Sequence, residues 1–273
     1  MKLVLIDLDN TLIDFNYRLT VPKEIFCEEV RELSNQDVCL GLCSDSAVIT
    51  LRYWADYLAI KGPIVAERGA VIWTLPQGEK IMNPGETNWL REFRDYFVTA
   101  VTRNFPDSTV MIGDATRIVK EGCIGAPFMQ KIFVINSFRV ASFSFFACKF
   151  RSVLEPDPEL LKQASTVVSK TLAKYGKNKK GLFWDENPLS GVLIVHVSTT
   201  GKGMGVSELV NQLKPEQTVM IGDSMSDFLD LPYVTQYAVG NASLDYKSRA
   251  SFVASRPLTE GVIECLQNVC KGG

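Results

Sequence analysis

Two aspartates, Asp7 and Asp9, follow the first apolar segment of the chain and lie one residue apart. Residues 3–7 predict a β-strand, so both acids are expected at its carboxyl end. In open α/β sheets this edge is where ligands bind and chemistry takes place. The pair therefore indicates either a catalytic site or a turn, and the rest of the sequence must decide between them.

A second acidic cluster follows another short apolar segment, residues 219–221. Asp223 and Asp227 lie four residues apart, so a helical turn could aim both side chains at one point. If parallel strands bring them beside Asp7 and Asp9, four carboxylates share one crevice, and their repulsion would raise their pKa values unless a cation intervenes. Oxygen ligands without a pair of histidines select a hard cation, so the pattern predicts Mg²⁺.

Two further residues stand where they could contact a phosphate group. Ser44 follows the predicted strand 38–42, and its hydroxyl could donate to a phosphate oxygen. Lys202 lies between two glycines just before a predicted helix, where its ammonium and the helix dipole both favour an anion. Each residue alone is more often a turn, a helix cap or a solvated side chain. Their combined positions at strand ends and helix starts favour a phosphate-handling site.

The composition argues against several classes of function. The 273 residues are 46% hydrophobic and carry a net charge of −2, which does not suit a nucleic-acid surface. Seven cysteines without a C-x-x-C pair predict reduced thiols in a cytoplasmic protein. No segment reads as a signal peptide or a membrane span, so no membrane partner is expected. The single histidine excludes a histidine-rich zinc site.

Strands and helices alternate near both termini, which predicts an α/β fold with a doubly wound, Rossmann-like parallel sheet. The middle of the chain differs, because long amphipathic helices at 87–105 and 158–175 accompany phenylalanine-rich strands. We interpret this region as an inserted α+β domain with an antiparallel sheet. A further helix is expected to begin at Phe228. The predicted division is core 1–82, insertion 83–190 and core 191–273.

Residues 7–12, with the sequence Asp-Leu-Asp-Asn-Thr-Leu, resemble the first motif, D-x-D-x-T, of the haloacid dehalogenase (HAD) superfamily. Ser44 resembles the second motif, Lys202 with Gly203 the third, and residues 222–227 the fourth, usually G-D-x-x-N-D. Residues 63–70 and 238–242 are similar to the I-A-E-N-G-A and V-A-M-G-N-A segments of its Cof-type branch. The insertion has the position and length of a type IIB cap domain.

This resemblance implies a mechanism. Asp7 would attack phosphorus to form an aspartyl-phosphate, while Asp9 would protonate the leaving oxygen and then activate water. Ser44 and Lys202 would stabilise charge on the transferring phosphoryl group, and Asp227 would orient Lys202 or a metal-bound water. Mg²⁺ would be held by the Asp7 carboxylate, the Asp9 backbone carbonyl and Asp223.

The chain departs from the family pattern at three places. Residues 44–46 read Ser-Asp-Ser where Thr-Gly-Arg is usual, Ser226 replaces an asparagine, and Arg68 replaces another. Archaeal phosphoglycolate phosphatases and mannosyl-3-phosphoglycerate phosphatases also lack that arginine, and their segments resemble residues 44–58 here. Contacts to substrate or to catalytic groups are expected from Thr11, Asp45, Ser46, Arg68, Ser226 and Asp227.

The sequence therefore predicts a Mg²⁺-dependent phosphatase that hydrolyses a small phosphorylated metabolite, such as a sugar phosphate or a phosphoglycolate-like compound. Mannosyl-3-phosphoglycerate phosphatase, a phosphomutase and a non-catalytic HAD-fold binding protein are the alternatives. Either a monomer or a homodimer is compatible with the sequence. Polar candidates for substrate selection in the insertion are Arg117, Glu121 and Lys149.

Overall fold

The computed structural model of the chain describes residues 1–14, 16–83, 89–115, 117–118, 126–175, 181–197 and 199–271. The chain divides into two compact units. The core unit comprises Met1–Met82 together with Thr200–Gly273, and the inserted unit comprises Asn83–Thr199. Glu121, a predicted polar candidate, lies outside the described residues.

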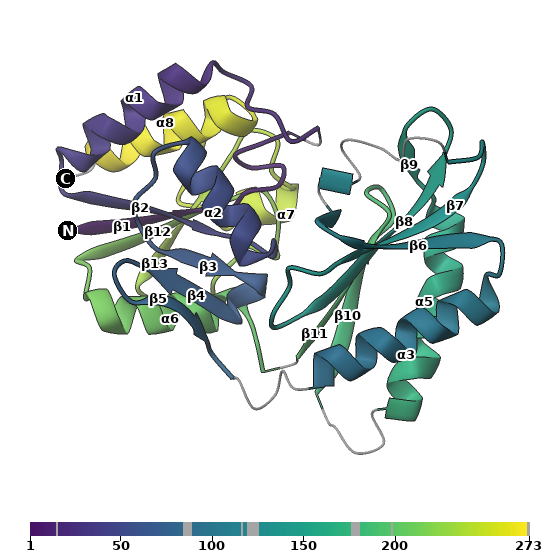
Figure 1. Ribbon diagram of the computed structural model, residues 1–273. Coiled ribbons are helices and arrows are strands. Elements are labelled where there is room, and N and C mark those ends of the chain that lie inside the picture. Colours follow the sequence, from purple (N-terminus) through teal and green to yellow (C-terminus); the bar gives the residue numbers. More distant parts are fainter. Residues whose placement is uncertain are drawn as a thin grey trace. The chain divides into compact units, whose positions relative to one another are not determined.

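The core unit is built on an eight-stranded sheet in the order β14-β13-β12-β1-β2-β3-β4-β5 (Figure 1). Neighbouring strands from β14 to β3 are parallel, whereas β3, β4 and β5 pair in antiparallel fashion. The predicted doubly wound parallel sheet is thereby confirmed. The strands are β1 (Lys2–Ile6), β2 (Val38–Cys43), β3 (Ile64–Ala66), β4 (Val71–Thr74), β5 (Gly78–Ile81), β12 (Gln217–Gly222), β13 (Val234–Ala238) and β14 (Phe252–Val253).

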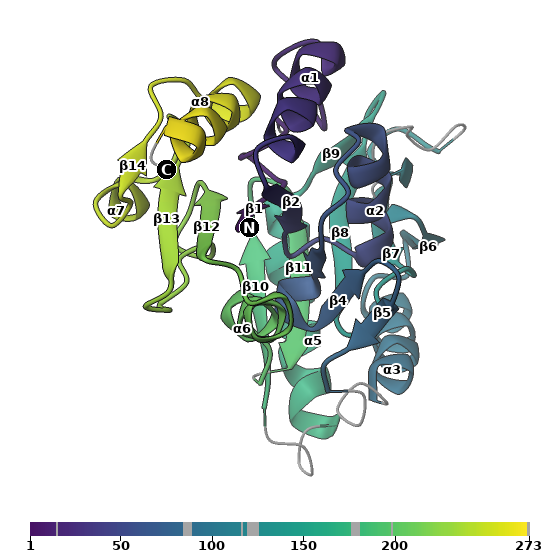
Figure 2. The ribbon, with the colours of Figure 1, turned by 90° about the vertical axis from the view of Figure 1, so that its left-hand side faces the viewer.

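Helices cover both faces of this sheet. Figure 1 shows α1 beside α8 on one face and α6 on the opposite face, and Figure 2 shows α7 and α8 close to the β13–β14 end of the sheet. With both faces covered, the central strand β1 is fully buried from Leu3 to Ile6. The helical elements are α1 (Lys23–Ser34), α2 (Val48–Tyr57), the 3₁₀ turn η1 (Glu67–Gly69), α6 (Lys202–Leu213), α7 (Leu244–Lys247) and α8 (Leu258–Lys271).

The register of the three central strands brings their carboxyl ends to one level. In β1, Ile6 lies opposite Ile221 of β12 on one side and Leu42 of β2 on the other. The chain leaves β1 towards β2, while β12 lies on its other side, so this is the point at which the winding of the sheet reverses. The residues just beyond the three strands emerge together at the edge where α/β sheets bind ligands.

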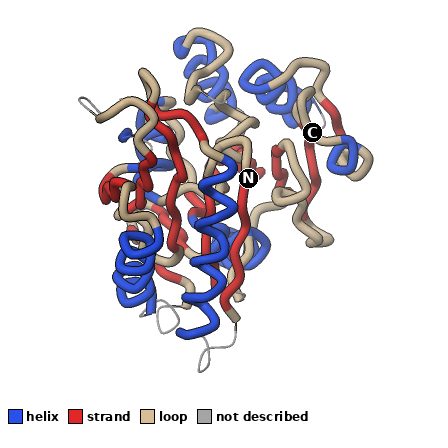
Figure 3. The backbone as a smooth tube through the Cα atoms, turned by 90° about the vertical axis from the view of Figure 1, so that its right-hand side faces the viewer, coloured by secondary structure: helices blue, strands red, loops and turns tan. Residues whose placement is uncertain are grey.

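The inserted unit has a six-stranded sheet in which β10-β11-β8-β7-β6 are consecutive neighbours and β9 pairs with β8. Two long helices lie against one face of it (Figure 3). The elements are α3 (Trp89–Asn104), β6 (Ser108–Gly113), β7 (Lys131–Asn136), β8 (Phe143–Phe150), β9 (Leu154–Pro156), α5 (Pro158–Tyr175), β10 (Leu182–Asn187) and β11 (Val192–Val197).

Aromatic side chains form much of the core between these helices and the sheet. Phe97 of α3 stacks on Phe145 of β8 with ring centroids 4.7 Å apart, and meets Phe143 edge-on at 5.0 Å. Such pairs add about 0.5–1.5 kcal/mol each beyond the area they bury. The phenylalanine-rich strands of the sequence therefore belong to the hydrophobic core. His196 is also buried, stacked on Phe183 with centroids 5.4 Å apart.

The predicted end of the insertion at residue 190 is too early. β11 pairs with both β10 and β8, so it completes the sheet of the inserted unit, which ends at Thr199. An apolar strand looks the same in a sequence whichever sheet it joins, and only its hydrogen-bond partners assign it. The insertion is also not wholly antiparallel, because β6 and β7 pair in parallel.

The helix expected to begin at Phe228 does not form, since residues 223–227 make a turn and residues 228–230 have no regular structure. Asp227 occupies this turn with its carboxylate bonded to local backbone amides, an alternative to helix that short acidic side chains favour. Among the described residues, no helix is both long and apolar enough to cross a membrane.

Candidate active site

Asp7 and Asp9 stand at the carboxyl end of β1, but in different surroundings. Asp7 is almost fully buried, and its backbone amide donates to the Ile221 carbonyl of β12 at 2.9 Å. Asp9 is half-buried in the turn that follows, where the amides of Leu12 and Ile13 both donate to the Leu8 carbonyl at 3.0 Å. The tight turn keeps both acids at the edge of the sheet.

The second acidic cluster forms a turn directly after β12. The Asp227 carboxylate accepts hydrogen bonds from the backbone amides of Asp223 and Ser224, each at 3.1 Å. Gly222 is required beside it, since a Cβ at that position would lie 2.5 Å from the Cβ of Asp227. The turn thus fixes Asp227 pointing back towards the sheet edge, and it does so without the helical turn that was expected.

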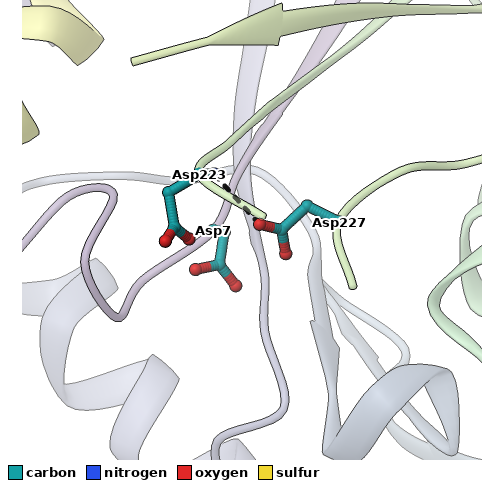
Figure 4. Close-up of side chains that lie close together, drawn as sticks. All are labelled: Asp7, Asp223 and Asp227. Atoms are coloured by element: carbon teal, nitrogen blue, oxygen red, sulfur yellow. Dashed lines mark hydrogen bonds between the residues drawn. The ribbon is translucent and has the colours of Figure 1, made fainter. Parts of the chain in front are cut away.

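Three carboxylates from these two segments converge. One oxygen from each of Asp7, Asp223 and Asp227 lies within 4.8 Å of the others (Figure 4). Thr11, from the turn after β1, donates its hydroxyl to Oδ1 of Asp223 at 3.2 Å and so joins the two segments. The predicted convergence of the two acidic clusters is therefore present for Asp7, Asp223 and Asp227, whereas the Asp9 carboxylate is not part of this close group.

Lys202 lies between two of these carboxylates. Its Nζ is 2.8 Å from Oδ1 of Asp7 and 2.5 Å from Oδ1 of Asp227, and all three side chains are buried. Lys202 is the first residue of α6, with Gly201 as the N-cap. The close approach of Gly69 sets this helix start, because a Cβ on Gly69 would lie only 2.1 Å from the Gly201 carbonyl oxygen.

The charges in this cluster perturb one another. Burial and the neighbouring Asp227 carboxylate raise the pKa of Asp7 well above its usual range, although Lys202 opposes them. Burial and Asp227 likewise raise the pKa of Asp223 to about 7. Burial alone would lower the pKa of Lys202, but the carboxylates of Asp227 and Asp7 outweigh it and raise that pKa well above its usual range.

This donor set fits a hard divalent cation. The three clustered carboxylates have one ammonium beside them, which bonds Asp7 and Asp227, so further positive charge would relieve the repulsion that raises the pKa values of Asp7 and Asp223. Carboxylate oxygens are the ligands that Mg²⁺ prefers. Asp227 is already bonded by Lys202, by two backbone amides and by the Ser224 hydroxyl at 3.3 Å. Asp7 and Asp223 are accordingly the side chains best suited to hold the ion.

The loop after β2 carries the predicted residues Ser44, Asp45 and Ser46. Ser44 is buried, and its Oγ accepts the backbone amide of Ser46 at 3.2 Å. The Asp45 carboxylate is close enough to Lys202 to contribute to the raised pKa of that lysine. Ser46 donates its hydroxyl to Oδ2 of Asp9 at 3.1 Å. Ser46 therefore contacts Asp9 directly, Asp45 lies near Lys202, and Ser44 is bonded to Ser46 within the same loop.

The turn after β3 is hydrogen-bonded to this loop through its backbone. Glu67 and Arg68 both have left-handed backbone conformations, with φ of 48° and 58°. Their amides donate to the carbonyls of Ser46 and Ser44 at 3.1 and 3.4 Å. Arg68 stands where the family pattern has an asparagine, a residue that tolerates this conformation better than arginine does. At this position it is the backbone amide that bonds to the loop.

Ser226, another predicted residue, is linked to the carboxylate cluster through Ser224, whose hydroxyl bonds Asp227. It is exposed, and its hydroxyl shares a hydrogen bond with Ser224 at 2.8 Å. In the inserted unit, Lys149 forms an ion pair with Asp157 at 3.2 Å. That carboxylate also caps α5 by accepting the Leu160 amide at 3.0 Å, so Lys149 has a structural partner.

Two residues of the segment 238–243 hold the site without having been singled out. Asn241 donates its Nδ2 to the Asn10 carbonyl at 2.7 Å and accepts the Leu258 amide at 2.9 Å, which ties the turn after β1 to the start of α8. Ser243 donates its amide to the Asp223 carbonyl at 2.8 Å. The similarity of residues 238–242 to a segment of the family was the signal available in the sequence, but it did not predict which residues Asn241 and Ser243 would contact.

No family model matches the chain. In sequence, the chain is 25% identical over 277 aligned residues to a phosphoglycolate phosphatase of Sulfolobus acidocaldarius, covering 100% of this chain and 98% of that protein. In structure, it resembles a HAD/Cof-like hydrolase of Plasmodium vivax, with a TM-score of 0.65 at 18% identity and coverage of 99% and 96% of the two chains. It also resembles a HAD subclass IIB sugar phosphatase, with a TM-score of 0.60 at 13% identity and coverage of 98% and 99%.

The structural likenesses establish the fold, and the sequence likeness extends over the whole chain. The sequence likeness to a phosphatase supports assignment of the chain as a phosphoric monoester hydrolase. The chain has the fold of the haloacid dehalogenase-like hydrolases, with a subclass IIB sugar phosphatase among its structural neighbours and a phosphoglycolate phosphatase among its relatives in sequence.

Proposed function

We propose that the chain is a Mg²⁺-dependent phosphatase that hydrolyses a small phosphorylated metabolite through an aspartyl-phosphate at Asp7. The observation that carries this proposal is the buried Lys202 ammonium, 2.8 Å from the Asp7 carboxylate and in one cluster with Asp223. A carboxylate held beside a cation at the end of a central strand is suited to attack an anionic phosphate, because the cation offsets the repulsion between them.

The residues divide the reaction between them. An Asp7 oxygen forms a bond to phosphorus while the ester bond to the leaving oxygen breaks, and Asp9 gives that oxygen its proton. Water then attacks the same phosphorus atom, its proton passes to Asp9, and the bond from phosphorus to Asp7 breaks. Ser44 and Lys202 are proposed to donate to the phosphoryl oxygens in both steps.

Asp7, Asp223 and the backbone carbonyl of Asp9 are the groups proposed to hold Mg²⁺. When bound, the ion supplies positive charge that favours the approach of an anionic phosphate to an anionic nucleophile. Asp227 is proposed to keep Lys202 in place, since it bonds the ammonium on one side and the turn after β12 on the other.

A phosphoglycolate-like compound is the substrate that the sequence likeness favours, because the Sulfolobus relative is named a phosphoglycolate phosphatase. The inserted unit would act as the cap that selects the substrate. Purified protein should release phosphate from phosphoglycolate, mannosyl-3-phosphoglycerate or hexose phosphates in the presence of Mg²⁺, and chelation should abolish the release.

Two variants make this test specific. Asp7→Asn should lose the activity, whereas Asp56→Asn, at an exposed aspartate of α2, should keep it. Equal rates in wild type and Asp7→Asn would indicate a contaminating enzyme. Isomerised sugar phosphate without free phosphate would favour a phosphomutase, and no turnover of any of these phosphomonoesters would favour a binding protein that keeps the fold without catalysis.

A further inference from the structure

One hydrogen bond in the core unit links the loop after β2 to the turn after β1. The Ser46 hydroxyl donates to Oδ2 of Asp9 at 3.1 Å, and the two residues are 37 positions apart in the chain. Both side chains are half-buried. An ionised carboxylate only accepts hydrogen bonds, so the hydroxyl must be the donor whenever Asp9 is charged.

The backbone around Ser46 is held on several sides, so its hydroxyl starts from a fixed position. The Ser46 carbonyl accepts the Glu67 amide at 3.1 Å, and the Ser46 amide donates to Oγ of Ser44 at 3.2 Å. Ser44 in turn donates its amide to the Val65 carbonyl at 2.9 Å. A donor whose loop is fixed in this way loses little entropy when it holds a carboxylate in one orientation.

We infer that Ser46 is a positioning residue for Asp9 and holds its carboxyl group in the orientation needed for proton transfer. This inference rests on the proposed function, in which Asp9 is the general acid and base. The Ser46 hydroxyl can remain bonded to Oδ2 before and after proton transfer, because a hydroxyl group can donate as well as accept a hydrogen bond. The bond therefore holds the Asp9 carboxyl group in one orientation in both protonation states.

The proton and the bonds balance through both steps. In the first, an Asp7 oxygen bonds to phosphorus, the ester P–O bond breaks, and the proton of the Asp9 carboxyl group moves to the leaving oxygen to give an alcohol. In the second, a water oxygen bonds to the same phosphorus, its proton moves to the Asp9 carboxylate, and the bond to Asp7 breaks. Ser46 keeps its own proton throughout and acts through Asp9 alone.

A positioning role makes a prediction that a purely structural role does not. A leaving group that departs as a stable anion needs no proton, whereas an alkoxide does need one. Loss of Asp9 orientation should therefore slow alkyl phosphates much more than p-nitrophenyl phosphate. The quantity to compare is kcat/KM, which reports the steps up to formation of the phospho-enzyme.

The experiment measures kcat/KM with Mg²⁺ for phosphoglycolate and for p-nitrophenyl phosphate in wild type, Ser46→Ala and Ser46→Thr. Ser46→Ala should lose about 10- to 100-fold with phosphoglycolate, a part of the 10²–10⁴ that general acids typically contribute, and less than about threefold with p-nitrophenyl phosphate. Ser46→Thr keeps the hydroxyl and should restore most of the loss. Asp9→Asn should show the same preference for the better leaving group.

Ser34→Ala is the matched control, because this serine at the end of α1 donates its hydroxyl to the Val30 carbonyl at 2.9 Å, away from the acidic cluster. It should leave both rates unchanged. Equal losses for the two substrates in Ser46→Ala, or no loss for either, would overturn the role of Ser46 while phosphatase function stands. Absence of activity in wild type on both substrates would instead overturn the proposed function and this inference with it.

Discussion

The Lys202 ammonium and the Asp7 carboxylate form an ion pair of 2.8 Å in which both side chains are almost fully buried. The pair joins the start of α6 to the end of β1 across 195 positions of the chain. Burying either charge alone would be costly, so each residue is held in the site by the other. The position of the proposed nucleophile therefore depends on the start of a helix from the distant part of the core unit.

Replacing Lys202 by methionine keeps much of the side-chain volume but removes the charge between Asp7 and Asp227. We expect a loss of about 3–5 kcal/mol in the free energy of unfolding of the metal-free protein and a fall in kcat/KM of about 100-fold or more. Calorimetry and phosphate release measure the two effects. The control is Lys80→Met, which breaks the exposed Lys80–Glu208 pair of 2.8 Å and should cost less than about 1 kcal/mol; similar losses in both variants would contradict the account.

Stability should depend on pH through Asp223. Its pKa is raised from an ordinary value near 3.8 to about 7, so the folded protein holds a proton that the unfolded chain has released. With no metal bound, the free energy of unfolding should therefore fall as pH rises from about 4 to about 7. Asp223→Asn should flatten this slope and raise the Tm of the metal-free protein at pH values above that range.

Mg²⁺ should stabilise the folded protein most strongly at pH values at which the carboxylates are ionised. Because metal binding requires deprotonated ligands, the rise in Tm on adding Mg²⁺ should be larger near neutral pH than in acid, and should be much reduced in Asp223→Asn. Thermal unfolding with and without a chelator measures this difference. An equal rise in Tm in wild type and Asp223→Asn would place the ion elsewhere.

Gly69 and Gly78 allow a test of how the start of α6 is positioned. Both have left-handed backbones, with φ of 83° and 80°. A Cβ on Gly69 would lie 2.1 Å from the Gly201 carbonyl oxygen, whereas nothing lies within 4 Å of a Cβ on Gly78. Each change to alanine should cost about 1–2 kcal/mol for the backbone conformation. Gly69→Ala should cost a further 1–3 kcal/mol or so for the overlap and should also reduce kcat/KM, because it displaces the residue before Lys202.

We expect Asn241 to support activity through the hydrogen bond that its side-chain amide donates, rather than through the size of its side chain. Asn241→Asp keeps the oxygen that accepts the Leu258 amide but loses the amide group that donates to the Asn10 carbonyl. We expect a fall of about 3- to 10-fold in kcat/KM with a loss of roughly 1 kcal/mol in stability. Asn268→Asp is the control, since Asn268, on α8, donates its side-chain amide to the hydroxyl of Tyr237 on β13 at 2.9 Å. Unchanged activity in Asn241→Asp would show that the turn after β1 needs no such support.

The sequence was sufficient for the parts of the fold and site that have a local signature. An apolar strand ending in acids predicted where Asp7 and Asp223 emerge, and alternation of strands and helices predicted a parallel sheet that would bring them together. Lys202 between glycines also proved to lie at a helix start. These features can be predicted because strand ends of one parallel sheet share an edge.

Other features depend on contacts between distant residues and left no local signature. The Ser46–Asp9 hydrogen bond could not be predicted from a serine that merely replaced an arginine. The left-handed backbone of Glu67 and Arg68 was also hidden, since neither residue type favours it. β11 was assigned to the wrong unit because pairing with β8 and β10, rather than its own composition, decides which sheet it joins.

The central claim is that Asp7 carries the phosphoryl group, and trapping that intermediate tests it most directly. Borohydride reduces an acyl phosphate and would convert a phosphorylated Asp7 to homoserine, which peptide mass spectrometry locates by position. With substrate and Mg²⁺ present, we predict this conversion at Asp7, with none in the absence of substrate and no conversion of position 7 in Asp7→Asn. Sustained turnover in the wild type with an unmodified Asp7, or with the modification at another aspartate, would contradict the account.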